Sequence, residues 1–404
     1  MPARIDEDDS NTGSRTVEAA PLRPRKAIIA RIILVGLCAV TLILARPLQS
    51  HAVAAGVLLR LSDTGDTMGL RDWRTVPIVR KSLTLELAGK SVPAYRYEPE
   101  IGAGPIGMVL VHGVHFRGID EPRLVRFAES IAKTGVTVLT PRIASLADYR
   151  IDRDAIVQIG GAAHALRQQL GADRPVGVLG ISFSGSLALL AAADETLGAD
   201  IAYVVTVGSY DDLGRVSRFY ATGSIERPDG TTVTLRPHEY GPVVWIYSHL
   251  ADFFPAEGLE DVRASLRHWL HEERDDARAG AARLPEASKK KLEAIFAGDI
   301  ATAAPDLADD VGRHAAELDA LSPHGHLEQI RVAVFALHGS DDHLIPPSET
   351  LWLAHDLPPG VLAYALISGA LTHVELGEQA SFAERFQAVH FMAGVLAAAR
   401  HAGT

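Results

Sequence analysis

The sequence contains almost no cysteine: Cys38 is the only one among 404 residues. A lone thiol cannot close an intramolecular disulfide, so a disulfide framework is excluded, as is a zinc site built from cysteines. Basic residues are not in excess either, because 39 Lys and Arg stand against 50 Asp and Glu, a net charge of −11. Proteins that bind nucleic acids need a basic face to contact phosphates, so we expect no nucleic-acid partner.

The N-terminal region changes abruptly from polar to apolar. Residues 1–26 are polar and contain three prolines, and we interpret them as a disordered cytoplasmic tail. Residues 27–46 are mainly apolar, and as a helix the run from Ala27 to Ala45 would extend roughly 28 Å, close to the thickness of a bilayer core. More basic residues precede this run than follow it, which predicts that the main body lies on the extracytoplasmic side. We therefore expect a single-pass membrane protein with a signal anchor.

Two alternatives to the transmembrane helix remain open. Counted from Ile32, the run without charge has only 14 residues, the size of a signal-peptide core, and Ala52-Val53-Ala54 provides an A-x-A cleavage site. The run is also compatible with a buried helix of a soluble protein. Residues 47–80 then form a connector, whose apolar part, residues 52–61, lies against the membrane or packs on the domain.

From about residue 81 onward, short β-rich runs alternate with helical patterns. The first two runs are separated by Ala88-Gly89-Lys90, which predicts a hairpin. The later runs are continuously apolar, as expected of strands that are covered on both faces. This pattern predicts an α/β fold, with a mostly parallel sheet and helices on both faces. The expected strands are 82–87, 92–97, 106–112, 136–141, 175–180, 201–208, 331–338 and 361–367. The expected helices are 121–134, 152–170, the stretch after 182, 347–356 and 378–399.

One segment interrupts this alternation. Residues 210–329 lack a comparable buried strand and show helical patterns at 245–254, 259–278 and 287–297. The segment is longer than an ordinary connection, so we interpret it as an inserted helical cap between core parts 81–209 and 330–404. It carries seven aromatic residues that either pack between cap and sheet or form an apolar acyl pocket. These are Phe219, Tyr220, Trp245, Tyr247, Phe253, Phe254 and Trp269.

A candidate nucleophile follows the strand that ends at Gly180. The sequence Gly180-Ile181-Ser182-Phe183-Ser184-Gly185 leads into the helical run LALLAAAD. A sharp turn between strand and helix exposes a serine, and small residues on either side let strand and helix approach closely. The hydroxyl still needs a neighbouring base to become reactive. Ser182 is therefore the candidate nucleophile, and a serine-rich turn without chemistry is the alternative.

Two further loops supply partners for such a serine. His112-Gly113-Val114-His115 follows the strand 106–112, and a tetrahedral oxyanion needs two backbone N–H donors, for which we select Val114 and Phe183. His112 and His115 are also spaced like metal ligands, but the sequence suggests no third ligand. In His338-Gly339-Ser340-Asp341-Asp342, the acid that orients a catalytic histidine is Asp342, with Asp341 second. Capping of the next helix is the other explanation of this acidic pair.

The candidate base is His373, which follows the last expected strand. The chain thus presents Ser182, Asp342 and His373 in that order, each in a loop after a strand. In an open α/β sheet such loops converge at one edge, where ligands bind.

These motifs resemble the α/β-hydrolase superfamily, and GISFSG and HGSDDHLIP resemble its dienelactone-hydrolase and serine-peptidase-like branches. The resemblance extends from residue 83 to the C-terminus, apart from the insert, which stands where this superfamily carries its cap. It implies Ser182 as nucleophile, His373 as base, Asp342 as orienting acid, and Phe183 and Val114 as oxyanion donors. The dienelactone branch often uses cysteine as nucleophile, which is excluded here because Ser182 occupies that position.

The sequence therefore predicts a serine hydrolase that cleaves small-molecule carboxylic esters through an acyl-serine intermediate, without metal or cofactor. A peptidase or an acyltransferase would use the same three residues. The non-enzymatic alternative is a membrane-tethered binding module without catalytic activity.

Overall fold

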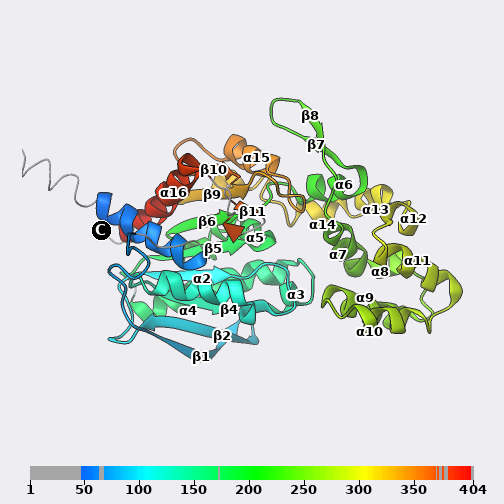
Figure 1. The fold of residues 1–404 in the computed structure, drawn as a ribbon, viewed down its shortest axis with the longest axis horizontal. Coiled ribbons are helices and arrows are strands. Elements are labelled where there is room, and N and C mark those ends of the chain that lie inside the picture. Colours follow the sequence, from blue (N-terminus) through cyan, green and yellow to red (C-terminus); the bar gives the residue numbers. More distant parts are fainter. Residues whose placement is uncertain are drawn as a thin grey trace, which may run out of the picture. The chain divides into compact units, whose positions relative to one another are not determined.

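An eight-stranded sheet organises the chain (Figure 1), in the order β1-β2-β4-β3-β5-β6-β9-β10. The computed structural model describes residues 47–62, 68–171, 173–369, 371–372, 375–376 and 381–401, and from Gln49 onward they belong to one compact unit. The strands of this sheet are β1 (Ile78–Leu87), β2 (Lys90–Pro99), β3 (Gly107–Val111), β4 (Thr137–Pro141), β5 (Val176–Ile181), β6 (Tyr203–Val207), β9 (Ala333–Gly339) and β10 (Leu362–Ser368).

The sheet opens with the predicted hairpin and continues as a parallel sheet. β1 and β2 are antiparallel and pair from Leu87↔Lys90, so Ala88 and Gly89 form the turn, both with positive φ. β2 pairs antiparallel with β4, whereas every later pair, from β4–β3 to β9–β10, is parallel. The expected α/β fold with a mostly parallel sheet is confirmed, although β1 begins at Ile78, earlier than the sequence pattern indicated.

Two hydrophobic cores lie on opposite faces of the sheet. Side chains alternate along β3, so that Val109 and Val111 belong to one core, while Met108 and Leu110 belong to the other. α4 and α5 cover the first face, and α2 and α16 cover the second. The helices of this part are α2 (Pro122–Ala132), α3 (Ala144–Ala147), α4 (Arg153–Leu170), α5 (Phe183–Ala193), α15 (Ser348–Asp356) and α16 (Phe382–His401).

A helical segment, residues 49–61, precedes the sheet and packs on the domain. Its side chains Val53 and Val57 contact Met392 and Leu396 of α16, and the Arg60 guanidinium donates to Ser130 Oγ at 2.9 Å. Of the two interpretations of this segment, contact with the membrane or packing on the domain, the structure shows packing on the domain. Among the described residues, no helix is long and apolar enough to span a bilayer, and the predicted membrane helix, residues 27–46, lies outside them.

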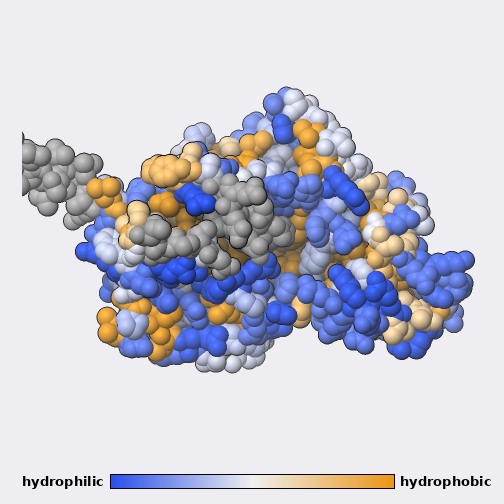
Figure 2. Space-filling model, in the orientation of Figure 1, coloured by the Kyte–Doolittle hydropathy of each residue, from blue (hydrophilic) through white to orange (hydrophobic). Residues whose placement is uncertain are grey.

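Helices dominate the insertion between β6 and β9, as predicted. They gather beyond one end of the sheet in Figure 1. The expected helix 259–278 is two helices, because Glu272 has a φ of 67° and breaks it. Figure 2 shows a mainly hydrophilic surface over α9 and α10, whose apolar side chains, such as Leu266, face inward. The elements are α6 (Leu213–Thr222), β7 (Ser224–Glu226), β8 (Thr232–Thr234), α7 (Tyr240–Ser248), α8 (Leu250–Phe253), α9 (Leu259–Leu270), α10 (Arg274–Ala281), α11 (Glu286–Phe296), α12 (Ile300–Ala303), α13 (Leu307–Arg313) and α14 (Ala315–Asp319).

Candidate active site

Ser182 occupies a strained turn between β5 and α5. Its backbone has φ 58° and ψ −131°, a conformation that non-glycine residues rarely adopt. The Ser182 N–H donates to Val207 O of β6 at 2.7 Å, which ties the turn to the neighbouring strand. The Ser182 hydroxyl makes no hydrogen bond with any described residue and lies on the wall of a cavity. The backbone at Ser182 therefore makes the sharp strand–helix turn that the sequence predicts.

Small residues around Ser182 make this turn possible. A Cβ on Gly180 would lie 2.4 Å from Gly185 Cα, and one on Gly185 would lie 2.0 Å from Ser209 Oγ. Ser184 stands where the usual motif has glycine, and its buried Oγ accepts from Ile181 N–H at 2.9 Å. That Oγ also lies 2.8 Å from the Ile181 carbonyl oxygen and 3.1 Å from that of Val111, so it can donate to either. Ser184 is therefore part of the scaffold of the turn.

The loop after β3 lies directly beside the nucleophile turn. A Cβ on Gly113 would lie 3.5 Å from Ser182 Cβ, an ordinary van der Waals distance, so the two backbones run close together here. In the described part of the chain, the N–H groups of Val114 and Phe183 donate to no protein acceptor. Val114 is buried beside the cavity, and Phe183 begins α5. Two uncommitted N–H groups therefore stand beside Ser182.

His112 orients this loop and is not placed to bind a metal ion. Its Nε2 accepts from Ile143 N–H at 3.1 Å, so the ring proton is on Nδ1, which donates to Gly113 O at 2.7 Å. Because C=O and N–H point in opposite directions across a planar peptide, this bond turns the Val114 N–H away from His112. Burial lowers the pKa of His112 to about 4, so the ring stays neutral near pH 7. Although the spacing of His112 and His115 in the sequence is typical of metal ligands, both ring nitrogens of His112 are therefore occupied by backbone hydrogen bonds and not by a metal ion.

The two neighbouring acids differ sharply in environment. Asp342 is buried, and its Oδ1 accepts from Leu344 N–H at 2.8 Å and Ile345 N–H at 3.0 Å. Its Oδ2 faces the end of β6, where a Cβ on Gly208 would lie 3.4 Å away. Asp341 is exposed and pairs with His343 at 3.0 Å. Of the two acids, Asp342 is therefore the one whose carboxylate lies at the sheet edge beside the Ser182 turn.

The predicted base, His373, lies outside the described residues. Before it in the chain, Ser368 at the end of β10 pairs with Gly339 of β9. The Ser340 N–H donates to Ser368 O at 3.1 Å, so the loops that follow β9 and β10 begin side by side. Short strands β11 (Leu371–Thr372) and β12 (Glu375–Leu376) follow. The role of His373 stays a prediction.

Ser182 opens into a cavity of about 370 Å³ that is lined by both polar and apolar residues. Gly113, Val114 and Phe183 line it near the hydroxyl, together with His115, whose pKa is lowered by burial. The apolar part comes from segments far apart in the chain, which no local sequence pattern connects. It is lined by Leu58, Leu61, Leu124, Phe127, Ala388, Phe391 and Met392.

Sequence reasoning missed Tyr240, which joins the cap to the loop after β3 that contains Val114. Its hydroxyl donates to Val114 O at 2.9 Å, and its ring lines the Ser182 cavity. All seven aromatic residues singled out in the insert are buried, so packing is their main role. Two of them, Tyr220 and Trp245, line a second cavity of about 310 Å³, whereas none lines the Ser182 cavity.

Comparison with known proteins gives likeness in structure only. No protein-family model matches the chain, and no curated protein is similar in sequence. One similar solved structure is an acylaminoacyl peptidase bound to a chloromethyl ketone, with 12% identity and a TM-score of 0.48. The match covers 80% of this chain and 42% of the peptidase, so this chain spans less than half of that protein.

Two esterases are similar at the same level. The esterase domain of a Rhodothermus marinus protein has 14% identity and a TM-score of 0.42, covering 79% of this chain and 96% of that one. Brefeldin A esterase, a bacterial homologue of human hormone sensitive lipase, has 14% identity and a TM-score of 0.42, covering 87% and 83%. Likeness at this level assigns no activity to this chain, whose chemistry depends on its own side chains.

Proposed function

We propose that this protein is a serine hydrolase of the α/β-hydrolase type that cleaves carboxylic esters through an acyl-serine intermediate. Ser182 is the nucleophile, His373 the base and Asp342 the acid that orients it, while Phe183 and Val114 N–H groups bind the oxyanion. The observation that carries this proposal is the strained backbone of Ser182, held at a cavity wall beside two uncommitted N–H groups. Strain of this kind persists where the surrounding structure needs it, and here it presents a hydroxyl to the cavity.

In the proposed reaction, His373 removes the proton of the Ser182 hydroxyl while Oγ attacks the ester carbonyl carbon. The negative charge that forms on the carbonyl oxygen is stabilised by the N–H groups of Phe183 and Val114. His373 then passes its proton to the alkoxide, which leaves as an alcohol and yields the acyl-serine. Water loses a proton to His373 as it attacks this ester, and His373 gives that proton to Ser182 Oγ as the bond to the acyl carbon breaks and the acid is released.

The cavity supports an ester with an apolar acyl chain. Besides the polar residues Glu121, Arg123 and Arg126, it is lined by leucine, phenylalanine and methionine side chains from residues 58–61, α2 and α16. Burial of an apolar chain there gains about 0.8 kcal/mol per CH₂. We therefore expect activity on p-nitrophenyl esters to rise from acetate toward medium-chain acyl groups.

Hydrolysis and active-site labelling test the proposal. The full-length protein is incubated with p-nitrophenyl esters and, separately, with a fluorophosphonate probe that modifies activated serines. We expect the wild-type protein to hydrolyse the esters and take up the probe, and Ser182→Ala to lose both. Wild-type protein that does neither would contradict the proposal and leave a binding module.

Two further measurements separate the related activities. A peptidase would cleave the matching amide at a rate comparable with the ester, and an acyltransferase would transfer the acyl group to an added alcohol in preference to water. We expect hydrolysis of the ester to dominate in both comparisons.

We further propose that residues 27–46 anchor the protein in a membrane with its main body on the extracytoplasmic side. The support is the apolar run 27–45 and the excess of basic residues before it. The protein should stay with the membrane after an alkaline carbonate wash, with the mass of the complete chain. A mature protein that begins after Ala54 would show that a signal peptide is cleaved instead.

A further inference from the structure

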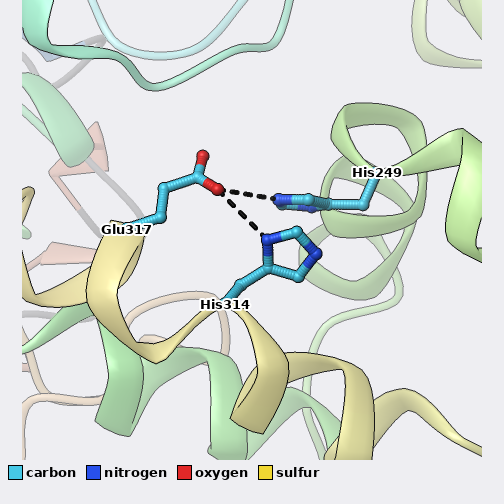
Figure 3. A group of neighbouring side chains, drawn as sticks. All are labelled: His249, His314 and Glu317. Carbon is cyan, nitrogen blue, oxygen red and sulfur yellow. Dashed lines mark hydrogen bonds and ion pairs between the residues drawn. The ribbon is translucent and has the colours of Figure 1, made fainter.

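Three potential metal ligands converge in the cap, away from Ser182. His249 stands between α7 and α8, while His314 and Glu317 come from the start of α14, so the ligands lie on segments far apart in sequence. Glu317 Oε2 is 3.2 Å from His314 Nδ1 and 3.6 Å from His249 Nε2, and the three ligand atoms lie within 4.8 Å of one another. Figure 3 shows the carboxylate facing a nitrogen of each ring.

The outer nitrogen of each histidine is held by a hydrogen-bond acceptor. His249 Nδ1 lies 3.1 Å from Trp245 O, and His314 Nε2 lies 3.1 Å from Asp252 Oδ2. Each outer nitrogen therefore donates a proton, and the inner nitrogen, His249 Nε2 or His314 Nδ1, is the one through which each ring would bind a metal ion. Histidines that bind metals usually donate their other ring N–H in this way, to a carbonyl or a carboxylate.

The three inner atoms can all bind a cation as electron-pair donors. A cation between them would replace the proton that a ring nitrogen needs in order to approach the Glu317 carboxylate favourably. Zinc ligands lie 2.0–2.2 Å from the ion, so neighbouring ligand atoms in a tetrahedral site are separated by about 3.3–3.5 Å. The separations of 3.2 and 3.6 Å in this cluster are close to that range.

A second arrangement around His314 fits a cation less well. Its Nε2 faces Asp252 and Asp310, but Asp310 Oδ1 already pairs with Arg313 at 2.6 Å. The other oxygen of Asp310 accepts from the Trp245 indole N–H at 2.7 Å. Because a guanidinium already neutralises this carboxylate, the inner face with His249 and Glu317 is the better site.

The surroundings also hold the rings in place and leave one side open. The His249 ring stacks on Trp245 with centroids 4.1 Å apart, and its side chain is only 11% exposed. Both His249 and Glu317 line the second cavity, whose wall also includes Phe183. A cation held by three protein ligands would keep a further coordination position for water or for a molecule in this cavity.

We propose that His249, His314 and Glu317 bind one divalent transition-metal cation, with Zn²⁺ as the reference ion. The bound ion links the α7–α8 junction to α14 and so stabilises the cap. This site is independent of the proposed ester hydrolysis and supplies no step of it.

Zinc binding to the full-length protein tests the site. The protein is stripped with EDTA and dialysed, and ZnCl₂ is added in a calorimeter. We expect one Zn²⁺ per chain, with affinity reduced about 100-fold or more in His249→Ala and in His314→Ala, since each removes a direct ligand. Glu317→Gln is a milder change at a side chain that is 54% exposed, so its reduced affinity cannot be attributed to unfolding.

A matched control separates this site from surface histidines. His268 pairs with Glu273 on the exposed side of the cap, in another group of histidine and acidic residues. His268→Ala should bind Zn²⁺ as the wild-type protein does. Zn²⁺ should also raise the melting temperature of the wild-type protein and of this control, and leave that of Glu317→Gln nearly unchanged. Binding that is equally strong in all four variants, or absent from the wild-type protein, would overturn the proposal.

Discussion

Gly180 and Gly185 touch across the turn that carries Ser182: a Cβ on Gly180 would stand 2.4 Å from Gly185 Cα. The obstacle is backbone on both sides, so no side chain can move aside. This contact lets α5 approach the end of β5 closely, where Ser182 has its positive φ. The tight turn that carries the candidate nucleophile therefore depends on two glycines.

Gly180→Ala should disrupt the turn. Because the added methyl group meets backbone, we expect a loss of about 3 kcal/mol in the free energy of unfolding, and loss of fluorophosphonate labelling. Urea denaturation measures the first and gel fluorescence the second. The control is Gly312→Ala in α13, where a Cβ meets nothing within 4 Å. Gly312→Ala should be as stable as the wild-type protein or slightly more so.

Ser184→Ala should separate the scaffold from the nucleophile. The substitution leaves the Ile181 N–H without its acceptor in a buried site, which costs about 1–3 kcal/mol. Ser182 keeps its hydroxyl, so labelling should persist at reduced thermal stability. Ser182→Ala should behave in the opposite way, with nearly unchanged stability and no labelling. Mass spectrometry of the labelled peptide identifies the modified serine, and a label on Ser184 would show that Ser182 is not the nucleophile.

The two acids after β9 should differ in their effect on catalysis. Asp342→Asn keeps the shape of the side chain but removes its charge, and we expect kcat to fall about 1,000-fold or more, as for acids that orient a catalytic histidine. Asp341→Asn changes an exposed carboxylate and should leave kcat within about twofold. Ester hydrolysis by the two purified variants makes the comparison. Equal rates would assign Asp342 a purely structural role in its loop.

His112 should make the protein sensitive to acid. Its pKa is about 4 in the folded protein, through burial, against 6.5 for an ordinary histidine. As pH falls below 6.5 the unfolded chain binds a proton that the folded chain does not, so the stability present above pH 6.5 is lost as pH falls toward 4. The full shift corresponds to about 3 kcal/mol.

His112→Gln removes this contribution. The variant should be less stable than the wild-type protein at pH 7.5, and the difference should shrink by about 2–3 kcal/mol at pH 4.5. Urea denaturation at both pH values measures the free energy of unfolding of each protein. Contributions from other titrating groups are the same in both proteins and cancel in the difference. A difference that is the same at both pH values would contradict the assigned pKa.

Tyr240→Phe should weaken catalysis through the oxyanion loop. The variant loses the hydrogen bond that holds the Val114 peptide, so we expect kcat to fall about tenfold with little change in KM. Tyr247→Phe is the matched control, because Tyr247 lies on the same helix, α7, and its hydroxyl donates to Asp148 Oδ1 at 3.1 Å. Both variants should lose about 1 kcal/mol of stability, but only Tyr240→Phe should lose activity.

Local sequence patterns were enough to predict the helices and strands, and also the turn that carries Ser182. A strand that is buried on both faces has to be continuously apolar, and a tight strand–helix turn has to be flanked by small residues. Both requirements are met within a few neighbouring residues, such as Gly180 to Gly185, so the sequence alone predicts them. The order of Ser182, Asp342 and His373 in loops after strands is likewise a property of the sequence, and the meeting of all three remains a prediction because His373 lies outside the described residues.

Other features depend on contacts between distant segments. The sequence favours Asp342 over Asp341 as the orienting acid, but only packing buries the Asp342 carboxylate beside Gly208 and leaves that of Asp341 exposed. The cavity brings Leu58 together with Met392, and the cap cluster brings His249 together with Glu317.

The sequence by itself thus determined the α/β architecture and which side chains follow its strands in loops, because both are encoded within short windows of the chain. Only the tertiary structure decided which polar groups are buried, which hydrogen bonds orient them and which distant side chains share a cavity. Burial and orientation result from the packing of whole elements, which the spacing of residues along the chain does not specify.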